Sequence, residues 1–290
     1  MSSRKGLLFV FIAAVLFSIG GLCVKLVPWN AMSINSFRSI ISVILLVIFA
    51  KVTGRKFKLT SGVIIGAVSM CGVTTLYAMA NKLTTAANTI LLQFTAPVFV
   101  ILVMWLVFKE RPKRLDVLTC VAVFGGVACF FLDSLGSGSI LGDALALLSG
   151  VCYAGVFMMN KFPGGDPLFA TILGQAMGAA IGFPWLVRET VFTGTALAAA
   201  LALGVFQLGV AYMFFTTGIR TAPPVSACLV AGIEPILNPV LVAVVLGEMI
   251  SPLSLLGGAI VFVSIMGYNV LTTKQEKQAE LAAQICKEEP

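Results

Sequence analysis

The sequence has no histidine and few charged residues. Asp, Glu, Lys and Arg make up 11% of its 290 residues, whereas a soluble domain carries about 25%. So few charges cannot coat a surface that faces water, and hydrophobic residues make up 59% of the chain. The composition therefore predicts a polytopic membrane protein. The absence of histidine also removes the usual general base and the commonest metal ligand.

Other absences narrow the function. No Cys-x-x-C pair occurs among the seven cysteines, so we expect neither a disulfide framework nor a zinc site. There is no Walker A sequence, which argues against ATP as the energy source. The net charge of +7 is spread in short clusters between apolar runs, and no nucleic-acid-binding signature accompanies it. We therefore expect no cofactor, no metal and no nucleic-acid partner.

Ten apolar runs are long enough to cross a bilayer, which requires roughly 20 apolar residues. Short links such as FPGGDP join them and leave no room for a soluble domain. The pattern predicts an all-α, multi-pass protein of the inner or plasma membrane, with lipids as its surroundings. The expected spans are residues 7–27, 34–52, 60–80, 84–107, 115–132, 140–160, 167–187, 196–217, 222–246 and 252–271.

The distribution of Lys and Arg sets the orientation. With the N-terminus placed in the cytoplasm, 15 of the 19 Lys and Arg residues fall in cytoplasmic segments. Positively charged loops remain preferentially on that side. We therefore expect both termini, and the polar tail 272–290, in the cytoplasm. Lys25 and Arg38 flank the first external loop and are predicted to snorkel toward lipid headgroups.

The chain contains a weak internal repeat at an offset of 138 residues. LLQFTAPVFVILVMWLVFKE then lies over LVAGIEPILNPVLVAVVLGE, with the same Pro-to-Glu spacing in both stretches. Each copy holds five spans, and an odd number makes the second copy enter the membrane from the opposite side. The sequence thus predicts ten transmembrane helices arranged as a 5+5 inverted-topology repeat. The predicted repeats are residues 5–135 and 138–271.

The ten spans, the inverted repeat and the two P-x12-E stretches resemble the EamA family of the drug/metabolite transporter (DMT) superfamily. The second copy, I-E-P…L-G-E, is close to the family's usual form, and the first copy has Lys109 where Gly is common. The resemblance implies secondary transport of a small metabolite, with efflux as the expected direction. It also implies alternating access through a central cavity between the halves. Members carry amino acids, sugars, or nucleotide-sugar-like or vitamin-like compounds.

Glu234 is an acidic residue near the middle of an apolar span. An ionisable side chain at that depth is costly and should face the protein interior. It is a candidate for binding a proton or an amine on the substrate; the alternative is a protonated acid in an interhelical hydrogen bond. Pro235 and Pro239 follow it, and Pro97 repeats the interruption in the fourth span. Paired breaks in two repeats indicate a binding site, although prolines also kink helices for packing alone.

Further polar and small residues recur at similar depths, and we interpret them as a substrate pathway with hinges. For each single residue, a structural hydrogen bond or close packing is the alternative. The substrate-pathway candidates are Ser18, Tyr77, Gln93, Tyr153, Gln207, Tyr212, Glu234 and Asn238. The helix-break and hinge candidates are Gly20, Gly21, Pro97, Gly155, Pro235 and Pro239. No residue is assigned as catalytic or metal-binding.

Gly174, Gly178 and Gly182 lie on one face of the seventh span. Such a row of small residues lets another helix approach closely. It serves packing within a monomer or the seam of a weak homodimer.

Three functions compete for this sequence. The repeat and the mid-membrane polar set favour a secondary carrier of a small polar or amphipathic metabolite, such as an amino acid, with a proton as a coupling partner. An integral-membrane enzyme would need a nucleophile–base pair or a metal cluster within the membrane, and neither is evident. A channel or sensor is the other alternative, but nothing resembles a selectivity filter.

Overall fold

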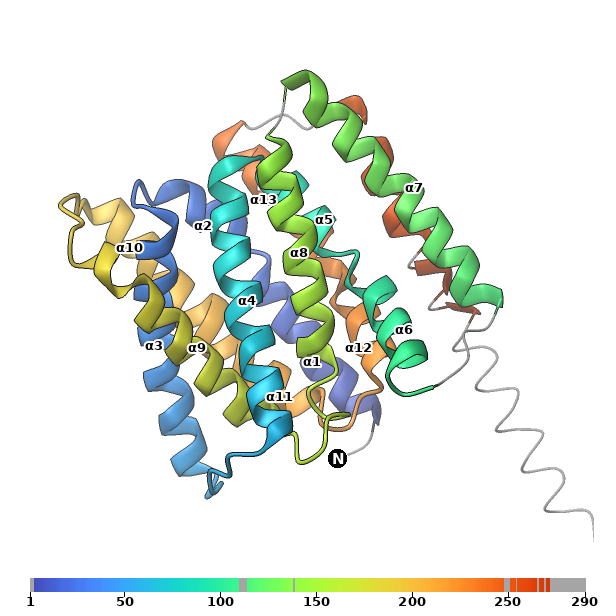
Figure 1. Ribbon diagram of the computed structural model, residues 1–290. Helices are drawn as coiled ribbons and strands as arrows, with labels where there is room; N and C mark the ends of the chain where they lie inside the picture. The colour runs from blue at the N-terminus through green and yellow to red at the C-terminus, as the bar shows by residue number, and fades with distance from the viewer. Residues whose placement is uncertain are drawn as a thin grey trace, which may run out of the picture.

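The computed structural model describes residues 3–109, 114–137, 139–247, 251–253, 255–264, 266–268 and 270–271. These residues form helices and connecting segments, and no strand occurs among them. The helices stand side by side as an elongated bundle (Figure 1). The predicted tail 272–290 and the two glutamates of the P-x12-E stretches, Glu110 and Glu248, lie outside the described residues.

Most predicted spans correspond to helices whose ends lie within a few residues of the expected positions. Among the described residues, seven helical segments are long and apolar enough to cross a membrane. The α-helices are α1 Ser3–Phe17, α2 Gly20–Leu26, α3 Ala31–Val52, α4 Ser61–Leu83, α5 Ala86–Gln93, α6 Ala96–Leu106, α7 Arg114–Ser137, α8 Ile140–Phe157, α9 Pro167–Leu186, α10 Gly194–Ala202, α11 Ala211–Gly218, α12 Pro224–Val230 and α13 Glu234–Leu246. The seven segments are Ser3–Leu26, Ala31–Val52, Ser61–Leu83, Asn88–Leu106, Ile140–Phe157, Pro167–Leu186 and Gly194–Gly218.

The three other predicted spans are also helical in their described residues, but they are not among these seven segments. The fifth is α7, the ninth is divided between α12 and α13, and the tenth holds the shorter apolar helix Leu255–Tyr268. α7 and this last helix touch: a β-carbon built on Gly126 would lie 2.7 Å from the Gly257 carbonyl oxygen. The molecule is therefore an all-helical, multi-pass membrane protein.

Two of the predicted spans are interrupted at proline. Pro97 has no N–H to bond the carbonyl of Gln93, and the helix ends at Gln93 and begins again at Ala96. Pro235 stands in the first turn of α13, after a 3-10 turn over Ala231–Ile233. Each proline thus lies where its missing donor costs no helical hydrogen bond.

Two further spans change geometry near their middle. The first bends at Ser18, between α1 and α2. The eighth passes from α10 to α11 through a π-helical segment, Leu203–Val210. π-helical turns are rare and occur often at functional sites. Interrupted helices are tolerated in a membrane where neighbouring groups or a cavity satisfy the freed backbone.

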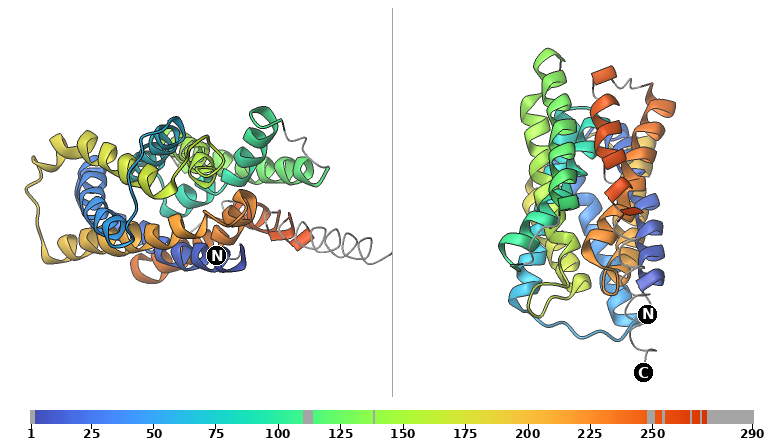
Figure 2. Two further views of the ribbon diagram at one scale, coloured as in Figure 1. Left: turned by 90° about the horizontal axis from the view of Figure 1, so that it is seen from below. Right: turned by 90° about the vertical axis from the view of Figure 1, so that its right-hand side faces the viewer.

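The glycine row of α9 packs within the chain. α9 lies against both α3 and α4 (Figures 1 and 2). A β-carbon would come within 2.5 Å of the Ala67 carbonyl oxygen at Gly174, and within 2.3 Å of the Met32 carbonyl oxygen at Gly182. Both approaches are closer than real β-carbons make. The glycines therefore allow α9 to sit in the groove between α3 and α4.

The helix pairs follow a regular scheme. α4 packs along α8, and α1 packs along α11. α9 packs on α4, and α3 packs on the π-helical segment that precedes α11. α3 and α9 contact each other, as do α5 and α13. In the order of the ten predicted spans, α3 and α9 belong to spans 2 and 7, and α5 and α13 to spans 4 and 9, so these contacts join spans five positions apart. The other four contacts form two matched pairs: spans 3 and 6 match spans 8 and 1, and spans 3 and 7 match spans 8 and 2.

Two residues 138 positions apart, each shortly after the end of a helix, share the left-handed backbone conformation. Gly247 follows α13 with φ +66°, the left-handed conformation that glycine adopts freely at a helix end. Lys109 follows α6 with φ +62°, and among the described residues it alone has a positive φ without being glycine. A lysine in this conformation is strained because its β-carbon crowds the backbone.

Lys109→Gly should therefore stabilise the protein. We expect the free energy of unfolding to rise by about 0.5–1 kcal/mol, since glycine removes the strain but adds freedom to the unfolded chain. Gly247→Ala, at the matching position, should lower it by about 1 kcal/mol. Thermal unfolding of the purified protein in detergent measures both changes. Equal melting temperatures for Lys109→Gly and the unmodified chain would contradict this.

Candidate functional site

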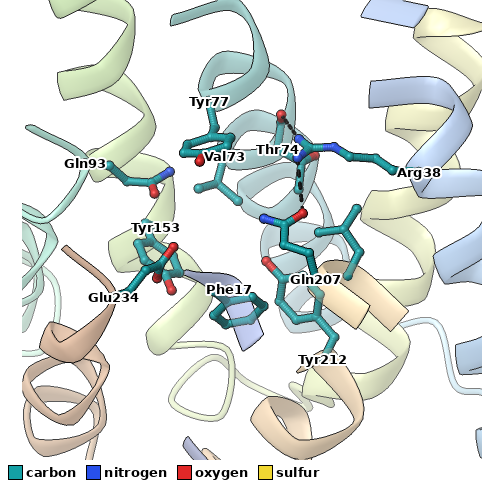
Figure 3. Close-up of a pocket in the computed structure, with 11 residues that line it drawn as sticks. Phe17, Arg38, Val73, Thr74, Tyr77, Gln93, Tyr153, Gln207, Tyr212 and Glu234 are labelled. Atoms are coloured by element: carbon teal, nitrogen blue, oxygen red, sulfur yellow. Dashed lines mark hydrogen bonds between the residues drawn. The ribbon is translucent and has the colours of Figure 1, made fainter. Parts of the chain in front are cut away.

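A cavity lies where the interrupted segments meet, near the middle of the bundle. It has a volume of about 30 Å³, enough for a few water molecules. Its walls come from both halves of the chain (Figure 3). The lining residues are Phe17, Arg38, Val73, Thr74, Tyr77, Gln93, Tyr153, Gln207, Leu208, Tyr212 and Glu234.

Arg38 lines this cavity. The prediction that its side chain snorkels to the lipid headgroups was therefore wrong. Its side chain is only 1% exposed. α3 begins at Ala31, so Arg38 lies two turns inside the helix. The sequence carried a signal for this burial, because polar residues cluster beside Arg38 on α3. These neighbours, Ser33, Asn35, Ser36, Ser39 and Ser42, are all 0% exposed.

The guanidinium of Arg38 is held by three neutral acceptors. Nη1 donates to Gln207 Oε1 at 3.3 Å, and Nη2 donates to Asn35 Oδ1 at 3.1 Å and to the Thr74 carbonyl at 2.7 Å. The guanidinium carbon also lies 5.8 Å from the centre of the Tyr77 ring. Nε has no hydrogen-bond partner in the described part of the chain. A guanidinium has five N–H donors, so the cation is fixed in place by three of them while Nε–H and the second N–H of Nη1 are left over.

Glu234 stands on another wall, at the start of α13 after the break. Its side chain is 4% exposed. The Tyr153 hydroxyl donates a hydrogen bond to its carboxylate, and Figure 3 shows these two side chains side by side. The second carboxylate oxygen, Oε2, is buried and has no hydrogen-bond partner among the described residues. The site therefore holds a buried acid as well as a buried cation, each with a polar atom that has no partner among the described residues.

The structure brings most of the predicted pathway residues together. Six of them line the cavity: Tyr77, Gln93, Tyr153, Gln207, Tyr212 and Glu234. Gln93 Nε2 donates to Ser149 Oγ at 3.1 Å. Asn238 lies just behind the wall, with its amide 3.5 Å from the Tyr77 hydroxyl. Ser18 is buried but donates to the Ala14 carbonyl at 2.9 Å, so it belongs to the helix bend and not to the lining.

The hinge candidates divide into two groups. Gly20, Gly21, Pro97 and Pro235 stand in the first or second residue of a helix that restarts after a break. Gly155 does not, because α8 runs through it, and a β-carbon there would lie 2.3 Å from Ser69 Oγ on α4. α13 likewise continues through position 239, so Pro239 marks no second break.

The two glycines of the first group hold α2 close to the cavity. A β-carbon on Gly20 would lie 2.7 Å from Gln207 Nε2. A β-carbon on Gly21 would lie 2.2 Å from Asn238 Oδ1. The absence of side chains at both positions therefore lets the first span close against the eighth and ninth.

Aromatic rings close the side of the cavity opposite to α2. Sequence reasoning missed this feature. Phe17 packs against Tyr212 with ring centres 4.9 Å apart, and Phe157 packs against Tyr153 at 4.7 Å and Phe215 at 5.3 Å. Phe157 is the last residue of α8, toward the end of the bundle where the N-terminus lies (Figure 1). Phenylalanines in a membrane sequence carry no mark that separates lipid-facing rings from a buried cluster. We call these five rings the aromatic cluster.

Comparison with known proteins decides the family. The sequence profile described as the EamA-like transporter family matches residues 4–132 and again residues 140–270. The chain belongs to this family. The resemblance seen in the sequence is thereby confirmed, and the EamA family places the protein among transmembrane transporters of the drug/metabolite superfamily.

Several curated proteins are similar to this EamA chain. Transporter YwfM of Bacillus subtilis strain 168 is 28% identical over 95% of this chain and 97% of its own length. The threonine/homoserine exporter RhtA of Escherichia coli K12 is 25% identical over 74% of this chain and 72% of its own length. A solved crystal structure superimposes with a TM-score of 0.66 at 18% identity, covering 92% of this chain and 98% of that one. This last likeness concerns the fold alone.

Gly21→Ala tests the close approach of the first span. The added β-carbon must displace Asn238, which is buried and lies against Tyr77. We expect the free energy of unfolding to fall by about 1–3 kcal/mol, as for overpacking of a tight interior. Gly125→Ala is the control, because a β-carbon there meets nothing within 4 Å. Thermal unfolding in detergent compares the two, and equal melting temperatures would show that α2 can move aside.

Proposed function

We propose that this EamA protein is a secondary transporter that exports a small polar or amphipathic metabolite, such as an amino acid, by alternating access. The observation that carries the proposal is the cavity itself. It holds a buried cation and a buried acid, and each of them has an unmatched polar atom. Buried polar groups without partners are costly, so a polar ligand is the natural occupant. RhtA, an exporter of threonine and homoserine by name, supports the amino-acid class.

The same proposal includes a 5+5 inverted repeat of ten spans, with halves 5–135 and 138–271. The family profile matches twice, once in each half. The helix contacts recur when each span is exchanged with the one five positions further along. Lys109 and Gly247, at equivalent positions, share the left-handed conformation. Such repeats commonly enclose a site near the bilayer midplane between broken helices.

We further propose that the protein lies in the cell membrane with both termini and the tail 272–290 in the cytoplasm. The excess of Lys and Arg in the alternate loops supports this orientation. The aromatic cluster then lies on the cytoplasmic side of the cavity, and Gly20 and Gly21 lie on the outer side. The protein is proposed to act as a monomer, because the glycine row of α9 is already occupied by α3 and α4.

Counterflow in proteoliposomes tests transport. Vesicles that hold the purified protein are loaded with an unlabelled compound and diluted into a trace of the same labelled compound. Amino acids, sugars, nucleobases and cationic drugs are tried in turn. A carrier gives transient, saturable accumulation of label, whereas an open pore or an enzyme gives none. Labelling of single cysteines added at the two termini, with an impermeant maleimide on whole cells, reports the orientation, and reaction from outside would contradict it.

Glu234 is proposed to bind and release a proton during the cycle. It faces Tyr153, Tyr77, Tyr212 and, across the cavity, Arg38. When Glu234 is protonated, its side of the cavity carries no negative charge. Protonation would therefore change which ligands the cavity binds.

Glu234→Gln, which resembles the protonated acid, should therefore transport at a rate that no longer varies with pH between 5 and 9, the range we would scan. The measurement is initial counterflow rate against pH. Tyr153→Phe is the companion variant, because it removes the hydrogen bond to Glu234 but keeps the acid; we expect its pH dependence to be shifted and not lost. A Glu234→Gln protein with the original rate and pH profile would refute the role.

A further inference from the structure

Arg38 is a buried cation whose hydrogen-bond acceptors in the described structure are all neutral. Its three hydrogen-bond acceptors are an amide oxygen of Gln207, an amide oxygen of Asn35 and a backbone carbonyl. None of them carries a charge, and Nε is buried without a partner. A buried cation without a counter-ion costs several kcal/mol of solvation. A planar guanidinium that is already fixed in orientation suits a carboxylate, which accepts two parallel hydrogen bonds.

Glu234 is the complementary group. Its carboxylate accepts a hydrogen bond from the Tyr153 hydroxyl, and Oε2 is buried without a partner among the described residues. The ring of Tyr153 lies beside it in Figure 3, and Tyr212 lines the same cavity. Tyrosine faces attract cations, so a carboxylate among tyrosine rings suits an ammonium group.

The two charges share one cavity but do not pair with each other. No ion pair joins Arg38 to Glu234 in the described structure, and Figure 3 shows them on opposite sides of the lining residues. Each is kept in place by its own neutral partners, Arg38 by Gln207 and Asn35, Glu234 by Tyr153. Opposite charges held apart across a cavity match a ligand that carries both signs, and the walls must move apart to admit one because the cavity as it stands has room for only a few waters.

We propose that the cavity recognises amino acids as zwitterions, with the carboxylate bound by Arg38 and the ammonium bound by Glu234. The proposal rests on the transport function above and adds the basis of its specificity. A molecule that carries only one of the two charges would leave either Arg38 or Glu234 without an oppositely charged partner. The carrier should therefore discriminate against amines and carboxylates whose side chains are the same.

Competition with blocked amino acids tests this. Proteoliposomes with the full-length protein are loaded with the twenty unlabelled amino acids and diluted into a trace of the same mixture labelled with 14C. Free L-threonine, L-leucine and L-phenylalanine are then compared as inhibitors with their amides, which are cations, and their N-acetyl forms, which are anions. We expect each free amino acid to inhibit at a concentration about tenfold or more below either blocked form, as the loss of a charge-assisted hydrogen bond predicts.

Two variants assign the charges to the residues. Arg38→Gln should lose the preference over the amides and keep the preference over the N-acetyl forms. Glu234→Gln should do the reverse. A structural role would lower transport of all compounds alike and leave both ratios unchanged. Arg38→Lys keeps the charge and serves if Arg38→Gln does not fold, and it should keep part of the preference over the amides. Lys56→Gln, in an exposed loop, is the control.

The outcomes separate this proposal from transport itself. If amides or N-acetyl forms inhibit as well as the free amino acids, zwitterion recognition is wrong but carrier activity stands. If amino acids give no counterflow while sugars, nucleobases or cationic drugs do, the protein is a carrier but does not recognise zwitterionic amino acids. If no compound gives counterflow, both proposals fail.

Discussion

The structure is organised around a positive charge buried inside a membrane protein. Arg38 is surrounded by helices on every side, and its guanidinium reaches α4 through the Thr74 carbonyl and the eighth span through Gln207. Hydrocarbon cannot solvate such a charge, so the neighbouring helices must supply polar groups at that depth. Asn35 meets this requirement directly, because it accepts a hydrogen bond from Arg38, whereas Ser36 and Ser39 of the same helix bond across to α9. The cavity is the part of this polar interior that the protein's own side chains leave unfilled.

The helix interruptions follow from the same requirement. A continuous helix presents only side chains to its surroundings, because its backbone groups bond to one another. The breaks before Pro97 and Pro235 bring two helix starts to the centre of the bundle, and Glu234 stands at one of them. The π-helical segment in the eighth span includes Gln207, which bonds Arg38. Each departure from a regular helix therefore lies beside a polar group that the cavity uses, and the regular helices α3, α4, α8 and α9 form the frame that holds them.

Sequence reasoning reached the helices, their approximate ends and much of the cavity, and the reasons are physical. Hydropathy reports the depth of a residue, and a carboxylate or a proline at mid-depth is conspicuous, so Glu234, Pro97 and Pro235 could be singled out. Hydropathy does not report which way a helix faces. Arg38 lies near the predicted start of a span, and its burial became evident only when α3 was seen to begin at Ala31. Gly155 was predicted to be a hinge for a related reason: the sequence shows a glycine but not whether it permits close packing or marks a bend.

The two ends of the cavity are closed by different means, and this difference bears on how it opens. On the side of α2, glycine backbone lies against Gln207 and Asn238, with no bulky side chain between them. On the other side, Phe17, Tyr153, Phe157, Tyr212 and Phe215 form edge-to-face and tilted ring contacts between α1, α8 and α11. Glycine contacts separate by a small shift of α2 as a rigid piece, which the bend at Ser18 already isolates from α1. The rings can part only if three helices move or several side chains change rotamer together, because close-packed interiors do not deform continuously. One side of the cavity is thus closed by glycine contacts and the other by packed rings, and closures of such different kinds are what the proposed alternating access would need in order to open one side at a time.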